Sequence, residues 1–288
     1  MKKLSFGFLC FILMCFLISS PAYGDIGPKP SVVIDFIGLE GKTYYVTLLS
    51  SVKTTGPYTA VKEGNISAYR YKKGDRDYDI FMKFVDYKDK DGFYFLQFFQ
   101  DCTQTHRFSW TYYPPNEFKI LIYLPDTDSF IVSDRSFERY AFDSYFTANV
   151  SETKITVKKS YDYTSEIISL IIRIVLTIGI ESGIALLFGF REKKLIYFIM
   201  LVNVITQILL NFGLNIINFL YGNLAFIVFY ILAEIMVLIL EAILYTRYIK
   251  KYGIISVSSW KAILYAFVGN GTSFILGMCL AFWIPAIF

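Results

Sequence analysis

Four long apolar segments in the second half of the chain constrain its fold more than any other feature. They cover about 165–190, 195–214, 224–245 and 262–284, and each has the roughly 20 residues that a helix needs to cross the hydrocarbon of a bilayer. Because backbone polar groups cannot stay unpaired in lipid, such segments predict transmembrane helices. We therefore predict a C-terminal all-α bundle of four transmembrane helices within 162–288.

The N-terminus has the layout of a secretory signal peptide. Lys2 and Lys3 precede an apolar run over 6–17, and small or helix-breaking residues follow up to Gly24. This order is typical of a segment that directs export and is then removed. We predict a signal peptide over 1–24; the alternative is a retained anchor helix, for which the apolar run is short.

The region from 25 to 161 consists of short runs in which β-branched and aromatic residues alternate with polar ones. Period-two alternation between turn residues predicts an all-β, antiparallel domain, and several short strands in one domain favour a sandwich over a barrel. In FKILIYL, apolar residues occupy both parities, so we expect this strand to be covered on both faces. The predicted strands are SVVIDFIG, TYYVTLL, DIFMKFV, FYFLQFF, RFSWTYY, FKILIYL, SFIVS, SYFTANV and TKITVKK.

The stretch DYKDKDG in this domain is similar to a calcium-binding loop. Asp89 and Asp91 precede Gly92 at the expected spacing, but Tyr87 and Phe98 occupy the first and last ligand positions. An Asp-Gly pair between two strand-like runs is also a turn signal. We therefore interpret the stretch as a turn with solvated charges.

The exported region contains one cysteine and the only histidine of the chain. Cys102 has no partner in this region, so no internal disulfide can form there. His106 lies four residues after Cys102, which on a strand is too far for a hydrogen bond. We expect a surface histidine and a buried thiol. The sequence predicts no catalytic residue, no metal site and no cofactor, and it disfavours an enzyme without excluding one.

The basic residues predict how the chain crosses the membrane. REKK, beginning at Arg191, and TRYIKKYG, which contains Lys250 and Lys251, lie next to the apolar segments, whereas the connector NIINFLYGN has no Lys or Arg. The positive-inside rule then places the two basic connectors in the cytoplasm. This agrees with the signal peptide, so we predict a multi-pass plasma-membrane protein with the β domain and the C-terminus outside. The positive net charge is then a topology signal and does not indicate nucleic-acid binding.

Polar residues recur at helical spacing inside the apolar segments. Asn203, Gln207 and Asn211 are four residues apart, and Glu234 and Glu241 are seven apart, so each set shares one helix face. Facing lipid, these groups would stay unpaired, so we expect them to meet inside the bundle. The predicted intramembrane polar cluster consists of Arg173, Glu181, Asn203, Gln207, Asn211, Glu234, Glu241 and Asn270. Counting the helical rise from the basic connectors places Glu241 nearer the cytoplasm than most of the others.

Two functions are compatible with this pattern. In the first, the extracellular β domain binds or senses an external ligand or partner, and the bundle anchors it in membrane lipid. In the second, the bundle is a small cation- or proton-coupled transporter or channel subunit, and four spans then predict a homo-oligomer or another membrane subunit. Helix packing alone is the competing explanation for the amides. The excess of carboxyl groups over the single Arg173 favours a functional role.

Three fragments, DIGPKPSV, FERYAFDSYFT and ILAEIMVLILEAILY, carry a resemblance to other membrane proteins. Together with NVITQILLN, they resemble a family of membrane proteins of Gram-positive, clostridial-type bacteria, in which an exported β domain precedes a small helical bundle. The resemblance covers most of the chain. It implies location and architecture, and it implies no activity because the family has none assigned.

Overall fold

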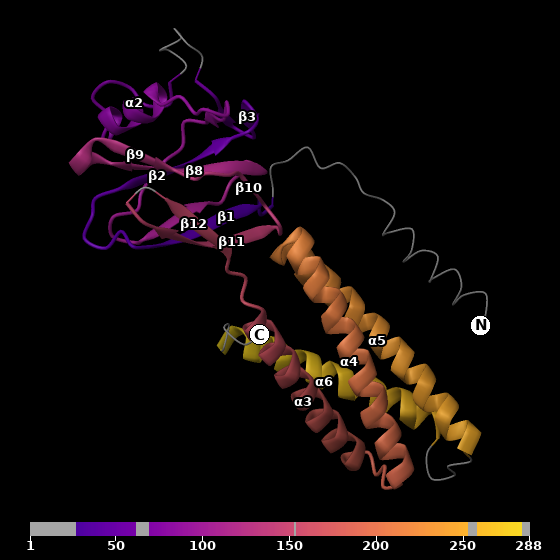
Figure 1. Cartoon of the computed structure of the whole chain (residues 1–288). Coiled ribbons are helices and arrows are strands. Elements are labelled where there is room, and N and C mark those ends of the chain that lie inside the picture. The colour runs from indigo at the N-terminus through magenta and orange to yellow at the C-terminus, as the bar shows by residue number, and fades with distance from the viewer. Residues whose placement is uncertain (1–26, 62–68, 153, 253–257, 284–288) are drawn as a thin grey trace.

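The computed structural model describes residues 27–61, 69–152, 154–252 and 258–283. A β-rich region is followed by four long helices (Figure 1). The signal peptide predicted over 1–24 lies outside the described residues.

One sheet of the β-rich region has the strand order β12–β11–β1–β7. Strands β1 and β7 pair antiparallel, as do β11 and β12, but β1 and β11 pair parallel. The prediction of purely antiparallel strands is wrong for this pair, because period-two alternation reports burial and does not encode strand direction. The strands are β1 (Ser31–Ile37), β7 (Arg107–Trp110), β11 (Asp143–Val150) and β12 (Ile155–Lys159).

The second sheet is antiparallel throughout, with the order β10–β8–β2–β5; β6 also pairs with β2, and β9 with β8. Its strands are β2 (Tyr45–Ser50), β5 (Tyr94–Phe95), β6 (Gln100–Asp101), β8 (Glu117–Leu124), β9 (Ser129–Val132) and β10 (Phe137–Glu138). Two short strands, β3 (Thr54–Thr55) and β4 (Tyr58–Thr59), form a separate ribbon. The short helix η2 (Pro125–Thr127) connects β8 to β9.

The two sheets share one apolar core, to which alternate residues of β1 and β8 contribute. Ile34 from β1, Phe118 and Ile120 from β8, and Trp110 from β7 are all fully buried in it. The opposite side of β8 is also covered, because Leu121 packs in a second apolar cluster with aromatic residues of a helix. The prediction that this strand is covered on both faces is therefore confirmed.

The helix that covers β8 is α2 (Tyr78–Asp86), and it occupies the segment DIFMKFV, which we predicted to be a strand. The prediction is wrong because a short apolar run fits the side-chain period of a helix as well as that of a strand. Phe81 and Phe84 are three residues apart, so a helix directs both rings to the same side, where they are buried against the second sheet.

Four helices form the C-terminal bundle: α3 (Tyr163–Leu187), α4 (Lys193–Tyr221), α5 (Asn223–Tyr252) and α6 (Ser259–Trp283). Each packs against two others, α3 and α5 both lying between α4 and α6, so the helices close a ring. Among the described residues, α3, α4 and α5 are long and apolar enough to cross a membrane. Their outward side chains are apolar and exposed, so the protein has a membrane-embedded region.

The connector NIINFLYGN differs from its prediction, because α4 continues to Tyr221 and only Gly222 separates it from α5. The segment contains no Gly or Pro before Gly222, so nothing stops the helix earlier. Gly222 has φ +81°, and a Cβ atom there would lie 2.5 Å from ring carbons of Phe142. Both the backbone conformation and the close approach of Phe142 therefore require glycine.

The β-rich region contacts this end of the bundle directly. The backbone N–H of Phe142 donates to the carbonyl of Phe219 in α4 (2.8 Å), and the N–H of Ser31 donates to the carbonyl of Phe142 (2.9 Å). The ring of Phe219 lies 5.4 Å from the ring of Tyr161 and 6.2 Å from that of Tyr140. These contacts join β1 to the last turn of α4.

Candidate functional site in the helix bundle

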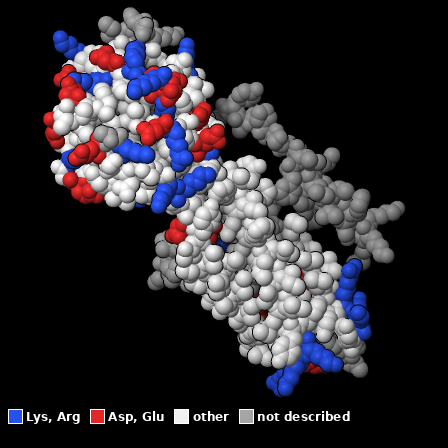
Figure 2. All heavy atoms as spheres, viewed as in Figure 1, with Lys and Arg blue, Asp and Glu red and all other residues white. Residues whose placement is uncertain are grey.

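The bundle has an apolar exterior and a polar interior. Figure 2 shows an almost uncharged surface over the helices, with Lys and Arg gathered at the end far from the β-rich region. These basic residues belong to the start of α4 and the last turns of α5, and they include Lys193, Lys194, Lys250 and Lys251. The interior polar groups lie at two levels, which we call the outer cavity, nearer the β-rich region, and the inner cluster.

The outer cavity has a volume of about 460 Å³ and is lined by all four helices. Arg173 of α3 donates from Nη1 to Oδ1 of Asn211 (3.3 Å), and Asn211 donates from Nδ2 to Oε1 of Gln207 (3.2 Å). Glu234 and Tyr230 of α5 also line the cavity. With Asn223 at the start of α5, it thus combines one guanidinium, one carboxyl group and three amides.

Aromatic rings form part of the wall of this cavity. The ring of Tyr230 lies 5.4 Å from that of Phe274 and is stacked 6.0 Å from that of Phe226. The guanidinium of Arg173 lies 6.0 Å from the centre of the Phe226 ring. Aromatic faces beside a carboxyl group form an environment that favours cationic groups.

The inner cluster is centred on Glu241 of α5, which is fully buried. Its carboxyl group accepts three hydrogen bonds: from Thr206 Oγ1 of α4 (2.9 Å), from Tyr245 OH one turn along α5 (3.2 Å), and from Asn270 Nδ2 of α6 (2.7 Å). The hydroxyl of Tyr245 in turn accepts from Asn203 Nδ2 (3.3 Å). Groups from three helices therefore converge on one carboxylate.

Glu181 of α3 belongs to the same level but has fewer partners. It is 1 % exposed, and the hydroxyl of Tyr265 lies 3.5 Å from Oε2. The carboxyl group lies 3.6 Å from the Cβ position of Gly269 in α6, so the small residue admits it between the helices. The amide of Asn203 faces the same carboxyl group, and Oδ1 of that amide has no hydrogen-bond partner although it is buried.

An apolar layer closes the bundle beyond the inner cluster, on the side of the basic residues. It is formed by the packed side chains of Phe190, Leu195, Ile199, Ala262 and Ala266, which are at most 1 % exposed. The outer cavity therefore ends at the inner cluster, and the single chain has no continuous polar path through these described helices.

All eight predicted residues of the polar cluster lie in the bundle, but they form two groups. Arg173, Gln207, Asn211 and Glu234 line the outer cavity, and Glu181, Asn203, Glu241 and Asn270 meet in the inner cluster. Glu241 lies at the level of Asn203 and Asn270, nearer the basic end of the bundle than the four residues of the outer cavity. Sequence reasoning did not select Thr206 or Tyr265, although Thr206 shares the helix face of Asn203.

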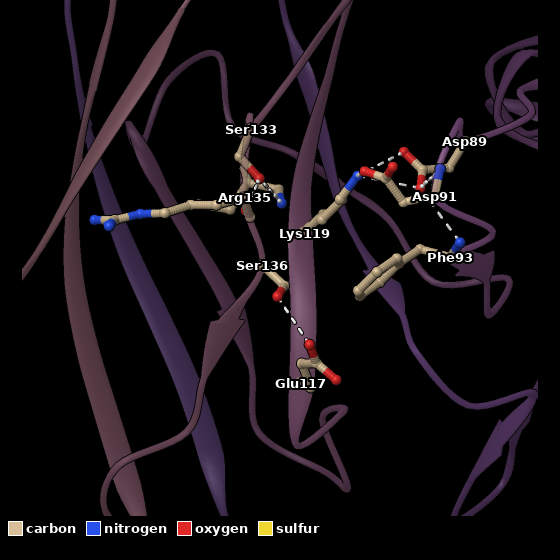
Figure 3. A network of polar contacts seen from close by, with 9 residues as sticks. Asp89, Asp91, Phe93, Glu117, Lys119, Ser133, Arg135 and Ser136 are labelled. Atoms are coloured by element: carbon tan, nitrogen blue, oxygen red, sulfur yellow. Dashed lines mark hydrogen bonds and ion pairs between the residues drawn. The ribbon is translucent and has the colours of Figure 1, made fainter.

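The stretch DYKDKDG proves to bind a lysine of the same chain (Figure 3). Lys119 of β8 contacts Asp89, at 3.2 Å, and also Asp91; its side chain and that of Asp89 are 5 % and 2 % exposed. Asp89 also accepts from the backbone N–H groups of Asp91 and Phe93. The turn is confirmed, but the prediction of solvated charges is wrong for Asp89. Burial alone lowers the pKa of Lys119, yet hydrogen bonds to Asp91 and Asp89 raise it overall.

Cys102 and His106 do not form a catalytic pair. The thiol of Cys102 is buried as expected, and burial raises its pKa, which makes it unreactive. His106 is half-buried and forms a 3.0 Å hydrogen bond between Nδ1 and the hydroxyl of Tyr44. In the part of the chain that the structure describes, no group of His, Cys, Asp and Glu could hold a metal ion.

Comparisons with protein-family models, curated proteins and solved structures give no match for this chain. The function is therefore argued from the bundle itself.

Proposed function

We propose that this protein is a plasma-membrane binding protein whose four-helix bundle takes a small molecule into the outer cavity from the extracellular side. The observation that carries the proposal is the cavity lined by all four helices, with Arg173, Glu234 and three amides on its walls. Its volume of about 460 Å³ lies within the range of about 300–1,000 Å³ that small-molecule sites occupy.

The lining supports a ligand that carries both charges. Glu234 lies near the rings of Tyr230 and Phe274, which together suit an ammonium group, whereas Arg173 and Asn211 suit a carboxylate. A small zwitterion has these groups at its two ends. An ion of a single charge would match only one of these two walls.

The orientation in this proposal rests on the basic residues. Lys193, Lys194, Lys250 and Lys251 lie at the end of the bundle away from the β-rich region (Figure 2). The positive-inside rule then assigns this end to the cytoplasm and the β-rich region to the outside. In the same arrangement α6, which packs along α3 and α5, is a fourth span and returns the chain to the outside.

Calorimetry on the full-length protein in lipid nanodiscs tests this function with three probes of different charge: betaine, choline and acetate. We expect betaine to bind most tightly, because only it has both charges. Glu234→Gln should weaken betaine and choline by about 10-fold, the size of a partly desolvated cation–π and charge contact. Equal binding of all three probes, or none, would refute the proposal.

A matched control separates the cavity from general charge effects. Glu192→Gln also removes one carboxyl group, but Glu192 lies in the exposed connector between α3 and α4. Betaine binding should be unchanged in this variant. If both variants weaken binding equally, the probe binds outside the cavity.

Ligand sensing by the β-rich region is a second candidate, supported by its contact with the bundle. The hydrogen bond from Phe142 to Phe219 and the close fit of Phe142 on Gly222 connect the two parts at the rim of the bundle. In this alternative a partner that binds the β-rich region changes the outer cavity through this contact. Gly222→Ala would disrupt the contact, and partner-dependent labelling of a cysteine placed in the cavity would then be lost.

A further inference from the structure

The inner cluster contains two buried carboxyl groups without a compensating cation. Glu181 and Glu241 are 1 % and 0 % exposed, and in the described part of the chain neither forms an ion pair. Two like charges that are buried close together cannot both stay ionised without strong repulsion. One of the two carboxylates therefore needs a positive charge to compensate it, and a bound proton is the smallest group that supplies one.

The hydrogen bonds distinguish the two carboxyl groups. Glu241 accepts from three donors, Thr206, Tyr245 and Asn270, and such donors stabilise a carboxylate. In the described part of the chain, the Glu181 carboxyl group accepts a long hydrogen bond from Tyr265, at 3.5 Å, and lies next to the Asn203 amide. The carboxyl group with the weaker set of donors is the one that can itself become a donor.

A buried acceptor without a partner lies beside Glu181. The Asn203 amide faces the Glu181 carboxyl group, and Oδ1 of this amide has no hydrogen-bond partner. Asn203 is 1 % exposed, so no bulk water reaches it. We propose that Glu181 is a proton-binding site, in which the protonated carboxyl group donates to Oδ1 of Asn203 while Glu241 stays ionised. The added proton then neutralises the Glu181 carboxyl group and gives Oδ1 of Asn203 a hydrogen-bond donor.

The groups that face Glu181 from the neighbouring helices fit this arrangement. From α5 they are Glu234, Glu241 and Tyr245, and from α6 Tyr265; α4 contributes the neutral Asn203. None of them supplies a positive charge. Arg173, the cation of α3 in this half of the bundle, lies two turns away and contacts Asn211.

The proton exchanges from the side of the β-rich region. Thr177 and Gln207 line the outer cavity and lie one helical turn from Glu181 and Asn203 respectively. On the other side, the layer that includes Phe190 and Leu195 separates Glu181 from the basic end of the bundle. The proton site does not depend on what the outer cavity binds, so the two proposals can fail separately.

Infrared difference spectroscopy of the full-length protein in lipid vesicles detects this proton directly. We expect the C=O stretch of a protonated carboxylic acid in wild type at neutral pH, and its loss in Glu181→Gln, whose amide can also donate to Asn203. Glu166→Gln, at the other end of α3 and bound to Tyr161, is the control and should retain the band. Absence of the band in wild type, or its survival in Glu181→Gln, overturns the proposal.

A second variant keeps the test valid if Glu181→Gln fails to fold. In Asn203→Leu the acceptor is removed, so the band should persist but shift to higher frequency, as expected for an acid without a hydrogen bond. An unchanged frequency contradicts the assigned partner. An alkaline pulse applied only on the side of the β-rich region should decrease the band before the same pulse on the basic side does; the reverse order overturns the assigned route.

Discussion

The β-rich region buries mainly apolar side chains, whereas the helix bundle buries polar ones and exposes apolar ones. Trp110 and Phe108 are fully buried between the sheets, whereas Leu187 of α3 is 87 % exposed and Glu241 of α5 is fully buried. Each part conceals the groups that its own surroundings solvate poorly, apolar groups in water and polar groups in lipid. The same chain therefore needs two different kinds of core.

The two cores also differ in what holds them together. Burial of apolar surface between the sheets is stabilised by about 25 cal/mol per Å² that is removed from water. Lipid provides no such driving force between helices, and hydrogen bonds between them average only about 0.6 kcal/mol each. Removal of one partner of the buried ion pair in the β-rich region should cost more than removal of hydrogen bonds between the helices, which the following variants test.

The largest effect is expected for Lys119→Ala in the β-rich region. The substitution leaves Asp89 buried without its cation, although Asp89 keeps two backbone donors. Removal of one partner of a buried ion pair costs about 3–5 kcal/mol, and the remaining donors favour the lower value of about 3 kcal/mol. Native-state hydrogen exchange of the amides of β8 measures this loss in the intact protein.

The sign of the pH dependence provides a control on the same site. Because the pKa of Lys119 is raised above its ordinary value of 10.5, the contribution is complete below that pH and is lost as the pH rises through the higher folded value. The double variant Lys119→Met with Asp89→Asn should recover most of the stability and lose this alkaline dependence. If Lys119→Ala leaves β8 fully protected, the pair does not stabilise the fold.

A smaller effect is expected for Glu241→Leu in the bundle, although this residue is more deeply buried. The variant removes the acceptor of three hydrogen bonds, from Thr206, Tyr245 and Asn270. At about 0.6 kcal/mol each, their loss amounts to about 2 kcal/mol. Unfolding in mixed detergent micelles measures it, with Met236→Leu on the exposed face of α5 as control. A loss as large as that of Lys119→Ala would contradict the comparison.

The sequence predicted the features that depend on periodicity. The two parities of β8 indicated a strand covered on both sides, and the four-residue spacing from Asn203 to Asn211 indicated one buried polar face on α4. Both follow from local geometry, because the side-chain period of a strand or helix does not depend on distant residues.

Other features depend on contacts between distant segments and could not be predicted. The strand direction of β11 is set by its pairing with β1, and the short run of α2 fits both periods. The separation of the polar residues into two levels depends on how the helices are staggered. Glu241 contacts Asn270 because α5 and α6 pack with these two residues side by side. The spacing of residues along one helix cannot predict this alignment between two helices.

Thr206→Val should have a smaller effect than Glu241→Leu. Valine keeps the shape of threonine and removes the hydroxyl, which lies 2.9 Å from Glu241 and also within hydrogen-bond distance of the carbonyls of Val202 (3.0 Å) and Asn203 (3.2 Å) of its own helix. We expect a loss of about 0.6 kcal/mol in the same detergent assay. Thr246→Val is the matched control, because the hydroxyl of Thr246 donates to a carbonyl of its own helix. An equal loss in both variants would mean that the contact with Glu241 adds nothing.

The smallest effect is expected for Asp128→Asn, which removes an ion pair of the β-rich region from the water-exposed surface. A hydrogen bond from Lys83, followed by one from Tyr123, lowers the pKa of Asp128. Any stabilisation is therefore present above the ordinary value of 3.8 and is lost as the pH falls through the lower folded value. Water and salt screen such pairs, so hydrogen exchange at neutral pH should be unchanged. Lys119→Ala and Asp128→Asn both break a Lys–Asp contact, at 3.2 Å between Lys119 and Asp89 and at 2.6 Å between Lys83 and Asp128. If the two variants lost equal stability, burial would not explain the contribution of the Lys119 pair to stability.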